Sequence, residues 1–376
     1  MKIVVDALPF VTLPTGIGRY ARLLYTYLSR YDIKIFYFVS NLSSQMPSPP
    51  KIESWRKRTD FLWKLPWPVV TCLRAIFWIR FEKRLLDSIK TERDIIIHEP
   101  ALFPLKTKLP QVFTLHDLTL MLRPHDHPKE RVFFFKLFFK RRLPYASHII
   151  SVSDFTRLEA ISHLSIPPEK ISAVPLAAAP HFRPASPSQI RQVLERYHLP
   201  PRYFLFVGTI DPRKNLDLVL KGLARLKKVP PLVIAGWKGW GYKVLLRKLS
   251  QLNLEDRVFL LDYVSDSDLR ALYSGAEAFF YPSFYEGFGL PVLEAMACGC
   301  PVITSKVTSL PEVAGDAAIL IDPSSEEEMV NAMEAVLDSK YRQELIQKGF
   351  KQAQKFSWEK CASETLAIFK KVLDER

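Results

Sequence analysis

Residues 284–303 read FYEGFGLPVLEAMACGCPVI and place two carboxylates, Glu286 and Glu294, in a segment that otherwise holds mainly glycine, proline and apolar side chains. Two acids in a segment of core-like composition need a physical reason, because buried charge is costly unless it is paired. The aromatic run at 278–281 is typical of a strand, and Pro282 ends it. The segment is therefore predicted to leave a strand through a loop.

The glycines and the proline of this segment indicate where the loop ends. Gly287 and Gly289 permit positive φ angles and a close approach of the backbone to a ligand, and Pro291 suits the first turn of a helix. We expect Glu286 in the loop and Glu294 in the first helical turn, both at the carboxyl end of a parallel sheet, where ligands bind. In a simpler interpretation, Glu294 complements the helix dipole and Glu286 is a solvated loop residue.

Short β-branched runs alternate with helix-length segments along the chain, which indicates βα units and parallel sheets. Strands are predicted at 2–6, 34–39, 94–98, 111–115, 148–152 and 171–174, and again at 203–208, 231–236, 257–261, 278–281, 301–304 and 317–321. A chain of 376 residues favours two domains, and the proline-rich stretch at 180–189 marks the seam. We expect one α/β domain over 1–185, a second over 186–357, and a final helix within 358–376.

Cysteine usage and the N-terminal sequence bear on the compartment. Four unevenly spaced cysteines give no disulfide framework and indicate a reducing environment. The first residues, MKIVVDALPF, lack the basic and apolar regions of a signal peptide. The most apolar stretch, 61–81, is interrupted by lysine, arginine and proline, so a transmembrane helix is not predicted. We expect a cytoplasmic protein.

The net charge of +14 is concentrated in the first half of the chain, since the excess of positive charges is 13 over 1–185 and 1 over 186–376. The two halves should therefore meet different partners. Basic residues are interleaved with aromatic ones at 55–84 and 129–146. The aromatic residues there fit either a buried core or an anionic membrane surface, and the charge distribution favours the membrane. No nucleic-acid-binding module is recognisable.

Two further loops have the properties of phosphate-binding segments. In VGTIDPRKNLDLVL, residues 207–220, a strand ends at Gly208 and a helix begins near Asn215, which places Arg213 and Lys214 at the mouth of the sheet. Adjacent cations suit a diphosphate, although an isolated Arg–Lys pair is more often a solvated turn. The Gly16 loop after the first strand opens a helix whose N–H groups could approach a phosphate.

The histidines offer one candidate site residue and one weak metal motif. His116 directly follows a predicted buried strand in QVFTLHDL, where it is placed to contact a substrate or to serve a structural role. His125 and His127 flank Asp126, but no second set of ligands completes a metal site. We therefore expect no metal and no resident cofactor.

Taken together, these motifs resemble those of the retaining glycosyltransferases of family 4. The segment from Glu286 to Glu294 matches the E-x7-E signature of that family, and VGTIDPRKN matches its phosphate-binding strand, turn and helix. LHDL at 115–118, VSDFTR at 152–157 and the early TGIG loop also fit in order. The resemblance spans nearly the whole chain, except for 50–92. It implies the GT-B fold, in which two Rossmann-like domains face a cleft and the last helix returns to the first domain.

The resemblance also implies a role for each candidate residue. The second domain would bind a nucleotide sugar and the basic first domain an acceptor. Glu294 would hold the ribose hydroxyls, and Glu286 and His116 would contact the transferred sugar. The diphosphate would meet Arg213 and Lys214, assisted by Gly16 and the backbone of Phe288, Gly289 and Leu290, and the loop at Val264 would contact the base. Two positions depart from the family pattern: Thr209, where many relatives have a basic residue, and Ala177, where a linker glycine is usual.

The implied reaction is transfer of a hexose with retention and without metal, because the two cations and the helix N–H groups can stabilise the leaving diphosphate. The form VGTxxPRKN with LHDL is most similar to bacterial mannosyltransferases of surface-polysaccharide and lipopolysaccharide assembly. It favours GDP-mannose as donor and a lipid-linked or polysaccharide acceptor, at the inner face of the cytoplasmic membrane. The alternatives are a soluble glucan-synthase-type, UDP-sugar-dependent or epimerase enzyme of the same fold, and a non-catalytic assembly partner.

Overall fold

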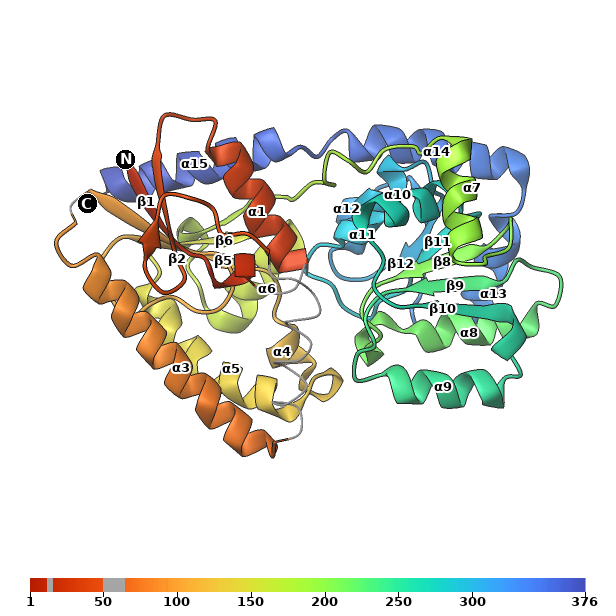
Figure 1. The fold of residues 1–376 in the computed structure, drawn as a ribbon, viewed down its shortest axis with the longest axis horizontal. Coiled ribbons are helices and arrows are strands. Elements are labelled where there is room, and N and C mark those ends of the chain that lie inside the picture. Colours follow the sequence, from red (N-terminus) through yellow and green to blue (C-terminus); the bar gives the residue numbers. More distant parts are fainter. Residues whose placement is uncertain (12–15, 50–64, 93, 376) are drawn as a thin grey trace. The chain divides into compact units, whose positions relative to one another are not determined.

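The computed structural model describes residues 1–11, 16–49, 65–92 and 94–375, and the chain divides into two compact units (Figure 1). Unit 1 comprises Met1–Leu176 and Trp358–Arg376, and unit 2 comprises Ala177–Ser357. The division between Leu176 and Ala177 lies just before the proline-rich stretch at 180–189. The last helix, α15 (Trp358–Asp374), therefore belongs to unit 1, where it packs on α1, β5 and β6.

Unit 1 is built on a sheet whose six longer strands are all parallel. In the order β3-β2-β1-β4-β5-β6-β7, its strands are β1 (Lys2–Asp6), β2 (Lys34–Phe38), β3 (Leu42–Ser43), β4 (Ile95–Glu99), β5 (Gln111–Leu115), β6 (His148–Ser151) and β7 (Ile171–Ala173). Their nearly continuous burial explains why these segments read as unbroken apolar runs. The six predicted strands are confirmed, and the short antiparallel β3 was not predicted.

Helices cover both sides of this sheet. Helices α1 and α15 lie together on one side, and α3 and α5 lie together on the other (Figure 1). Besides α15, the described α-helices of unit 1 are α1 (Gly16–Leu28), α3 (Trp67–Ser88), α4 (Thr119–Leu122), α5 (Lys129–Arg142) and α6 (Asp154–Leu164). Within the described residues, none of the helices is both long enough and apolar enough to cross a bilayer.

The aromatic residues of the two basic segments are divided between core and surface. Trp78 is 1% exposed, and its ring contacts Phe81 and Phe103. Phe134 and Phe138 of α5 also pack against Phe103. The membrane interpretation is therefore wrong for these side chains, because the core of unit 1 takes them up. Trp55 and Trp63 lie outside the described residues.

Unit 2 repeats the plan with an all-parallel sheet. In the order β10-β9-β8-β11-β12-β13, its strands are β8 (Phe204–Val207), β9 (Leu232–Ala235), β10 (Val258–Leu261), β11 (Ala278–Tyr281), β12 (Val302–Ser305) and β13 (Ala318–Ile321). The longer helices are α7 (Pro187–Arg196), α8 (Leu216–Arg225), α9 (Tyr242–Gln251), α10 (Asp266–Gly275), α11 (Leu290–Ala297), α12 (Leu310–Ala314), α13 (Glu326–Ala335) and α14 (Ser339–Ala353). All six strands predicted for this half are confirmed.

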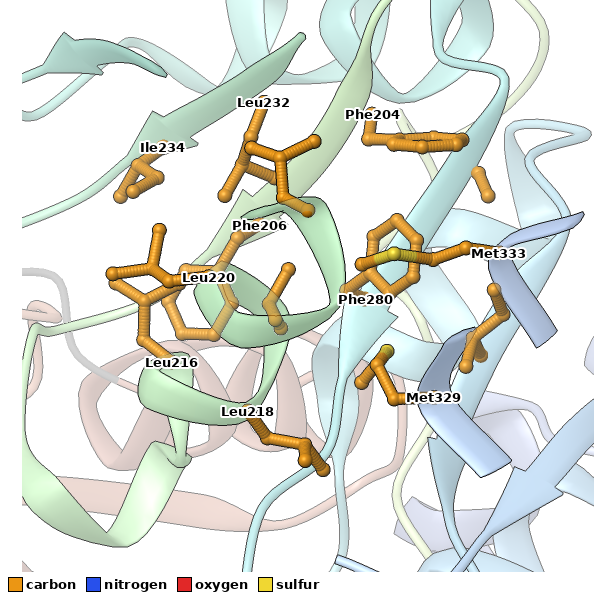
Figure 2. Close-up of a cluster of buried hydrophobic side chains, with 14 of the residues drawn as sticks. Phe204, Phe206, Leu216, Leu218, Leu220, Leu232, Ile234, Phe280, Met329 and Met333 are labelled. Atoms are coloured by element: carbon orange, nitrogen blue, oxygen red, sulfur yellow. The ribbon is translucent and has the colours of Figure 1, made fainter. Parts of the chain in front are cut away.

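The core of unit 2 lies between one face of the sheet and the helices α8 and α13. Figure 2 shows Phe204, Phe206 and Phe280 on the strands facing leucines of α8 and two methionines of α13. Gly222 of α8 allows this packing, because a Cβ there would lie 2.9 Å from Met329 Cγ. The resulting close contact holds α8 against α13.

In both sheets the order of successive strands reverses at the first strand, since β1 lies between β2 and β4 and β8 lies between β9 and β11. In open α/β sheets the loops that leave the carboxyl ends of such neighbouring strands diverge and open a crevice for ligands. A ligand site is therefore expected at two places. In unit 2 it is formed by the residues that follow β8 and β11, and in unit 1 by those that end β1 and β4.

Candidate functional site

The loop after β8 carries Arg213 and Lys214 in a single 3-10 turn, Pro212–Lys214. The carboxylate of Asp211 caps this turn by accepting the backbone N–H of Lys214 at 3.3 Å. Asn215 has a φ of 55°, and its side-chain amide donates to two backbone carbonyls, of which that of Pro282 lies at 3.1 Å. Helix α8 then begins at Leu216, so the two cations precede the helix in a loop that is fixed at both ends.

Glu286, in the loop after β11, joins the two cations. Its Oε2 lies 2.8 Å from Arg213 Nη1, and its Oε1 accepts a hydrogen bond of 2.6 Å from Lys214 Nζ. Lys214 also donates to the hydroxyl of Tyr281. The side chains of Arg213, Lys214 and Glu286 are only 13%, 10% and 9% exposed. The simpler interpretations, a solvated acid and a solvated basic turn, are therefore wrong.

The charges of this cluster stabilise one another. Burial alone would raise the pKa of Glu286, but Arg213 and Lys214 outweigh it and lower that pKa to about 2. Burial and the nearby Arg213 lower the pKa of Lys214, while burial raises that of Asp211, whose Oδ2 is 3.9 Å from Arg213. Two cations thus face two acids. An anion that binds here competes with Glu286 for the N–H groups of Arg213 and Lys214.

Glu294 lies deeper in the unit than the sequence predicts. Gly289 adopts a φ of 109°, and α11 starts at Leu290, so Glu294 is the fifth residue of the helix rather than part of its first turn. It is 3% exposed, and the hydroxyl of Tyr273 on α10 lies 3.4 Å from its Oε2. The prediction of a first-turn position was wrong by one residue, because the left-handed Gly289 is the N-cap and the helix already begins at Leu290.

The loop before α11 is held in place by the segment after β12. Ser309 donates from its hydroxyl to the carbonyls of Glu286 and Phe288, each at 2.9 Å, and Thr308 Oγ1 accepts the N–H of Glu286 at 3.3 Å. Neither hydroxyl was singled out from the sequence. Their position in the loop that follows the strand predicted at 301–304 is the signal that could have identified them. They fix the backbone from Glu286 to Phe288.

Val264 is buried in the loop that follows β10. The neighbouring ring of Tyr263 stacks on Trp237, which follows β9, with ring centroids 5.1 Å apart and an interplanar angle of 28°. Sequence reasoning missed Trp237, although an aromatic residue after the strand-ending Gly236 is a usable signal. The stacked pair lies at the carboxyl ends of two adjacent strands, beside β8.

In unit 1, His116 directly follows β5, as predicted. Its Nε2 donates to the carbonyl of Pro100 at 2.7 Å, which leaves Nδ1 as an acceptor, and its ring meets that of Tyr20 edge-on at 5.0 Å. Burial lowers the pKa of His116, so its imidazole is neutral near pH 7. Gly16 is the first residue of α1, and a Cβ added to it would meet no atom within 4 Å.

Asp6 and Glu99 end the neighbouring strands β1 and β4, and the sequence analysis missed both. Each is 0% exposed, so two acids are buried at the ends of adjacent strands. Burial raises the pKa of Asp6 to about 6 and that of Glu99 well above its ordinary value. Glu99 also accepts the N–H of Leu102 at 3.0 Å and so fixes the turn whose Pro100 carbonyl orients His116. The sequence signal that could have identified these two residues is the acid at the end of each apolar run, KIVVD and IIIHE.

This acid pair should make unit 1 less stable as the pH rises. The pKa of Asp6 moves from 3.8 to about 6 on folding, so its contribution is complete below the lower value and is lost as the pH rises through the higher one. We expect Asp6→Asn, which keeps an acceptor for Leu8 N–H, to reduce the fall in unfolding temperature between about pH 5 and about pH 8. Asp87→Asn, at an exposed acid of the same unit, should leave the slope unchanged, and equal slopes for both variants would refute the raised pKa of Asp6.

The histidine-rich loop before α5 is occupied by contacts within the chain. The carboxylate of Asp126 pairs with Arg123 at 2.5 Å, and His127 Nε2 lies 3.0 Å from the hydroxyl of Thr119. Among the residues that the structure describes, no group of three or more His, Cys, Asp or Glu side chains is arranged to hold a metal ion.

Comparison with known proteins agrees with these motifs. Residues 14–181 match the model of Glycosyltransferase Family 4, and residues 190–352 match that of Glycosyl transferases group 1. The O-antigen chain mannosyltransferase B of Escherichia coli is 35% identical, over 98% of this chain and 100% of its own length. The O-antigen chain mannosyltransferase RfbU of Salmonella typhimurium is 26% identical, over 80% of this chain and 78% of its own.

Comparison with solved structures gives a consistent result for the fold. The structure of sucrose-phosphate synthase from Thermosynechococcus elongatus matches with a TM-score of 0.76 at 18% identity, covering 100% of both chains. This likeness concerns the fold alone, whereas the Escherichia coli relative shares sequence over its full length. The chain therefore belongs to the glycosyltransferases of family 4, and its two parallel-sheet units are those of the GT-B fold.

Proposed function

We propose that this glycosyltransferase transfers mannose from GDP-mannose, with retention and without a metal ion, to a lipid-linked or polysaccharide acceptor at the inner face of the cytoplasmic membrane. The observation that carries the proposal is the buried cluster of Arg213, Lys214 and Glu286 at the switch point of the second sheet. The names of the two O-antigen mannosyltransferase relatives support the sugar and the kind of acceptor.

In this proposal the donor diphosphate takes over N–H groups that Glu286 now engages. Arg213 and Lys214 bind the phosphate oxygens, and the carboxylate of Glu286 is released to accept hydroxyl groups of the sugar. As the bond to the anomeric carbon breaks, the two cations stabilise the charge that develops on the leaving GDP, which is the task a metal ion performs in other enzymes. No resident cofactor takes part.

The remaining roles follow the resemblance to the family. Glu294 would hold the ribose, the backbone of Phe288, Gly289 and Leu290 would contact the phosphates together with Gly16, and the loop at Val264 would contact the base. His116 would contact the transferred sugar as a neutral imidazole, with Nδ1 as an acceptor for a hydroxyl group. In this proposal His116 acts as a neutral side chain and donates no proton to the substrate.

Ligand-dependent stability tests the donor. We expect GDP-mannose to raise the unfolding temperature of unit 2, because a ligand at about 100 times its Kd stabilises the folded state by about 2.7 kcal/mol. UDP-glucose and ADP-glucose at the same concentration serve as the comparison, and a larger shift with UDP-glucose would favour the UDP-sugar alternative.

Mannosyl transfer should persist in EDTA, and the product should keep the anomeric configuration of the donor. Donor binding with no transfer to any glycan acceptor would instead favour the non-catalytic partner.

A further inference from the structure

The outer face of α3 exposes an unusual set of apolar side chains. Among the described residues, six of the fourteen exposed large apolar side chains lie on this helix, with exposed fractions between 43% and 56%: Trp67, Val69, Leu73, Ile76, Phe77 and Ile79. A patch of this kind on a protein surface marks an interaction site.

The spacing of these residues sets them apart from the core face of the same helix. Val69, Leu73, Ile76 and Phe77 follow the i, i+4, i+7, i+8 pattern of one helical stripe. The buried residues of α3, among them Trp78, face the core of unit 1 instead. Helix α3 is thus apolar on both sides over its first turns, but only one of these sides packs against the core of unit 1.

Positive charge borders this stripe. Arg80, Lys83 and Arg84 are exposed on the following turns of α3, and Lys136 is exposed on the adjacent α5. Of the two acids on these turns, Glu82 is buried and paired with Arg142 at 2.9 Å, and Asp87 is exposed, so the three exposed cations of α3 face one exposed acid. The exposed face therefore combines apolar turns with cations.

Two grooves on this face repeat the combination. One, of about 310 Å³, is lined by Leu73, Ile76 and Phe77 together with Arg80 and Arg84. The other, of about 330 Å³, is lined by Trp67 and Phe133 together with Lys129 and Lys136, and its two rings meet at 5.8 Å. A groove lined by both apolar side chains and two cations suits a molecule with an apolar chain and an anionic head.

We propose that the face of α3 formed by Trp67–Arg84 is the surface by which this chain docks on anionic phospholipid. Helix α3 lies along the bilayer, Leu73 and Phe77 enter the acyl region, and Arg80 and Arg84 bind lipid phosphates. The inference deepens the proposed peripheral location and rests on it. A second copy of the chain is a poorer partner, because it would bring the same cations together, and a neutral glycan would leave them without a counter-charge.

Vesicle flotation with matched variants tests this surface. We expect the full chain to float with phosphatidylcholine vesicles that contain phosphatidylglycerol, and less so as salt is added. Leu73→Ser with Phe77→Ser should weaken binding about 10-fold or more, since two exposed apolar side chains lose a buried environment. Val244→Ser with Leu246→Ser, two apolar residues exposed to a similar degree on α9, is the control and should bind as the unmodified chain does.

A second pair of variants tests the charge. Arg80→Gln with Arg84→Gln should weaken binding by about 5-fold for each cation removed. Lys227→Gln with Lys228→Gln, at two exposed lysines of unit 2, removes the same charge elsewhere and should have no such effect. Equal losses for the two charge variants would show a response to net charge only and would overturn the assignment to α3.

Turnover and mass in solution separate the remaining outcomes. Turnover of a soluble glycan acceptor by the Leu73→Ser, Phe77→Ser variant should equal that of the unmodified chain, and a selective loss would assign this face to the acceptor instead. A dimer that the same variant converts to a monomer would assign it to a second copy, and no flotation on anionic vesicles would also refute the proposal. Flotation without any mannosyl transfer would instead refute the proposed function and leave this surface standing.

Discussion

Lys214→Ala should lower kcat/KM for the nucleotide-sugar donor by about 100-fold, because it removes one of the two cations assigned to the leaving diphosphate. Glu286 would then keep a single cationic partner, Arg213, at 2.8 Å. We expect both a higher KM for the donor and a lower kcat, since the cation contacts the phosphate in the bound donor and more strongly as charge develops. Initial rates at limiting and at saturating donor measure the two effects.

Two further variants separate the loss of charge from the loss of packing. Lys214→Met keeps most of the side-chain volume beside the ring of Tyr281, over which the ammonium lies at 4.6 Å, and it should be as inactive as Lys214→Ala but more stable. Lys227→Ala, at an exposed lysine after α8, should change neither rate nor stability. An unaltered rate for Lys214→Met at limiting donor would be incompatible with the proposed phosphate role.

Gly236→Ala should destabilise unit 2 by about 4 kcal/mol or prevent its folding, which is the largest effect on stability that we expect. Gly236 has a φ of 145°, and a Cβ added there would lie 2.1 Å from the carbonyl oxygen of Gly208. Because backbone cannot move aside as a flexible side chain can, the loops after β8 and β9 would have to separate. Chemical denaturation of the full chain, followed by a probe in unit 2, measures the change.

Gly208→Ala is the matched control for this prediction. Gly208 has almost the same φ, 148°, but a Cβ there would meet only Lys214 Cε, at 3.9 Å. It should therefore show the cost of the backbone conformation alone, about 1–3 kcal/mol, without the steric overlap. Equal destabilisation by the two substitutions would mean that the conformation, and not the close approach of the two loops, requires glycine at position 236.

The local order of strands, loops and helices could be predicted because its signals are local. Apolar runs bounded by proline or glycine located all six predicted strands of unit 2, and the loops that carry Arg213 and Glu286 were placed correctly between strand and helix. Pro291 was placed correctly in the first turn of α11, but Glu294 lies one residue beyond that turn, since the start of the helix depends on the φ of Gly289, which the sequence permits but does not require.

Contacts between distant segments could not be predicted in this way. Lys214 and Glu286 are 72 residues apart and meet because β8 and β11 are neighbours in the sheet. Asp6 and Glu99 meet for the same reason on β1 and β4. Strand order depends on how all the helices pack against both faces of the sheet, so no single segment contains it.

The sequence by itself determined the succession of βα units, the segments that carry the chemistry and the excess of positive charge in the first half. Only the tertiary structure decided that Glu286 binds both cations, that two acids are buried together in unit 1, and that Trp78 is buried while Phe77 beside it is exposed. The physical reason is that composition and periodicity act along the chain, whereas burial and charge pairing depend on which surfaces the packed sheets and helices leave open.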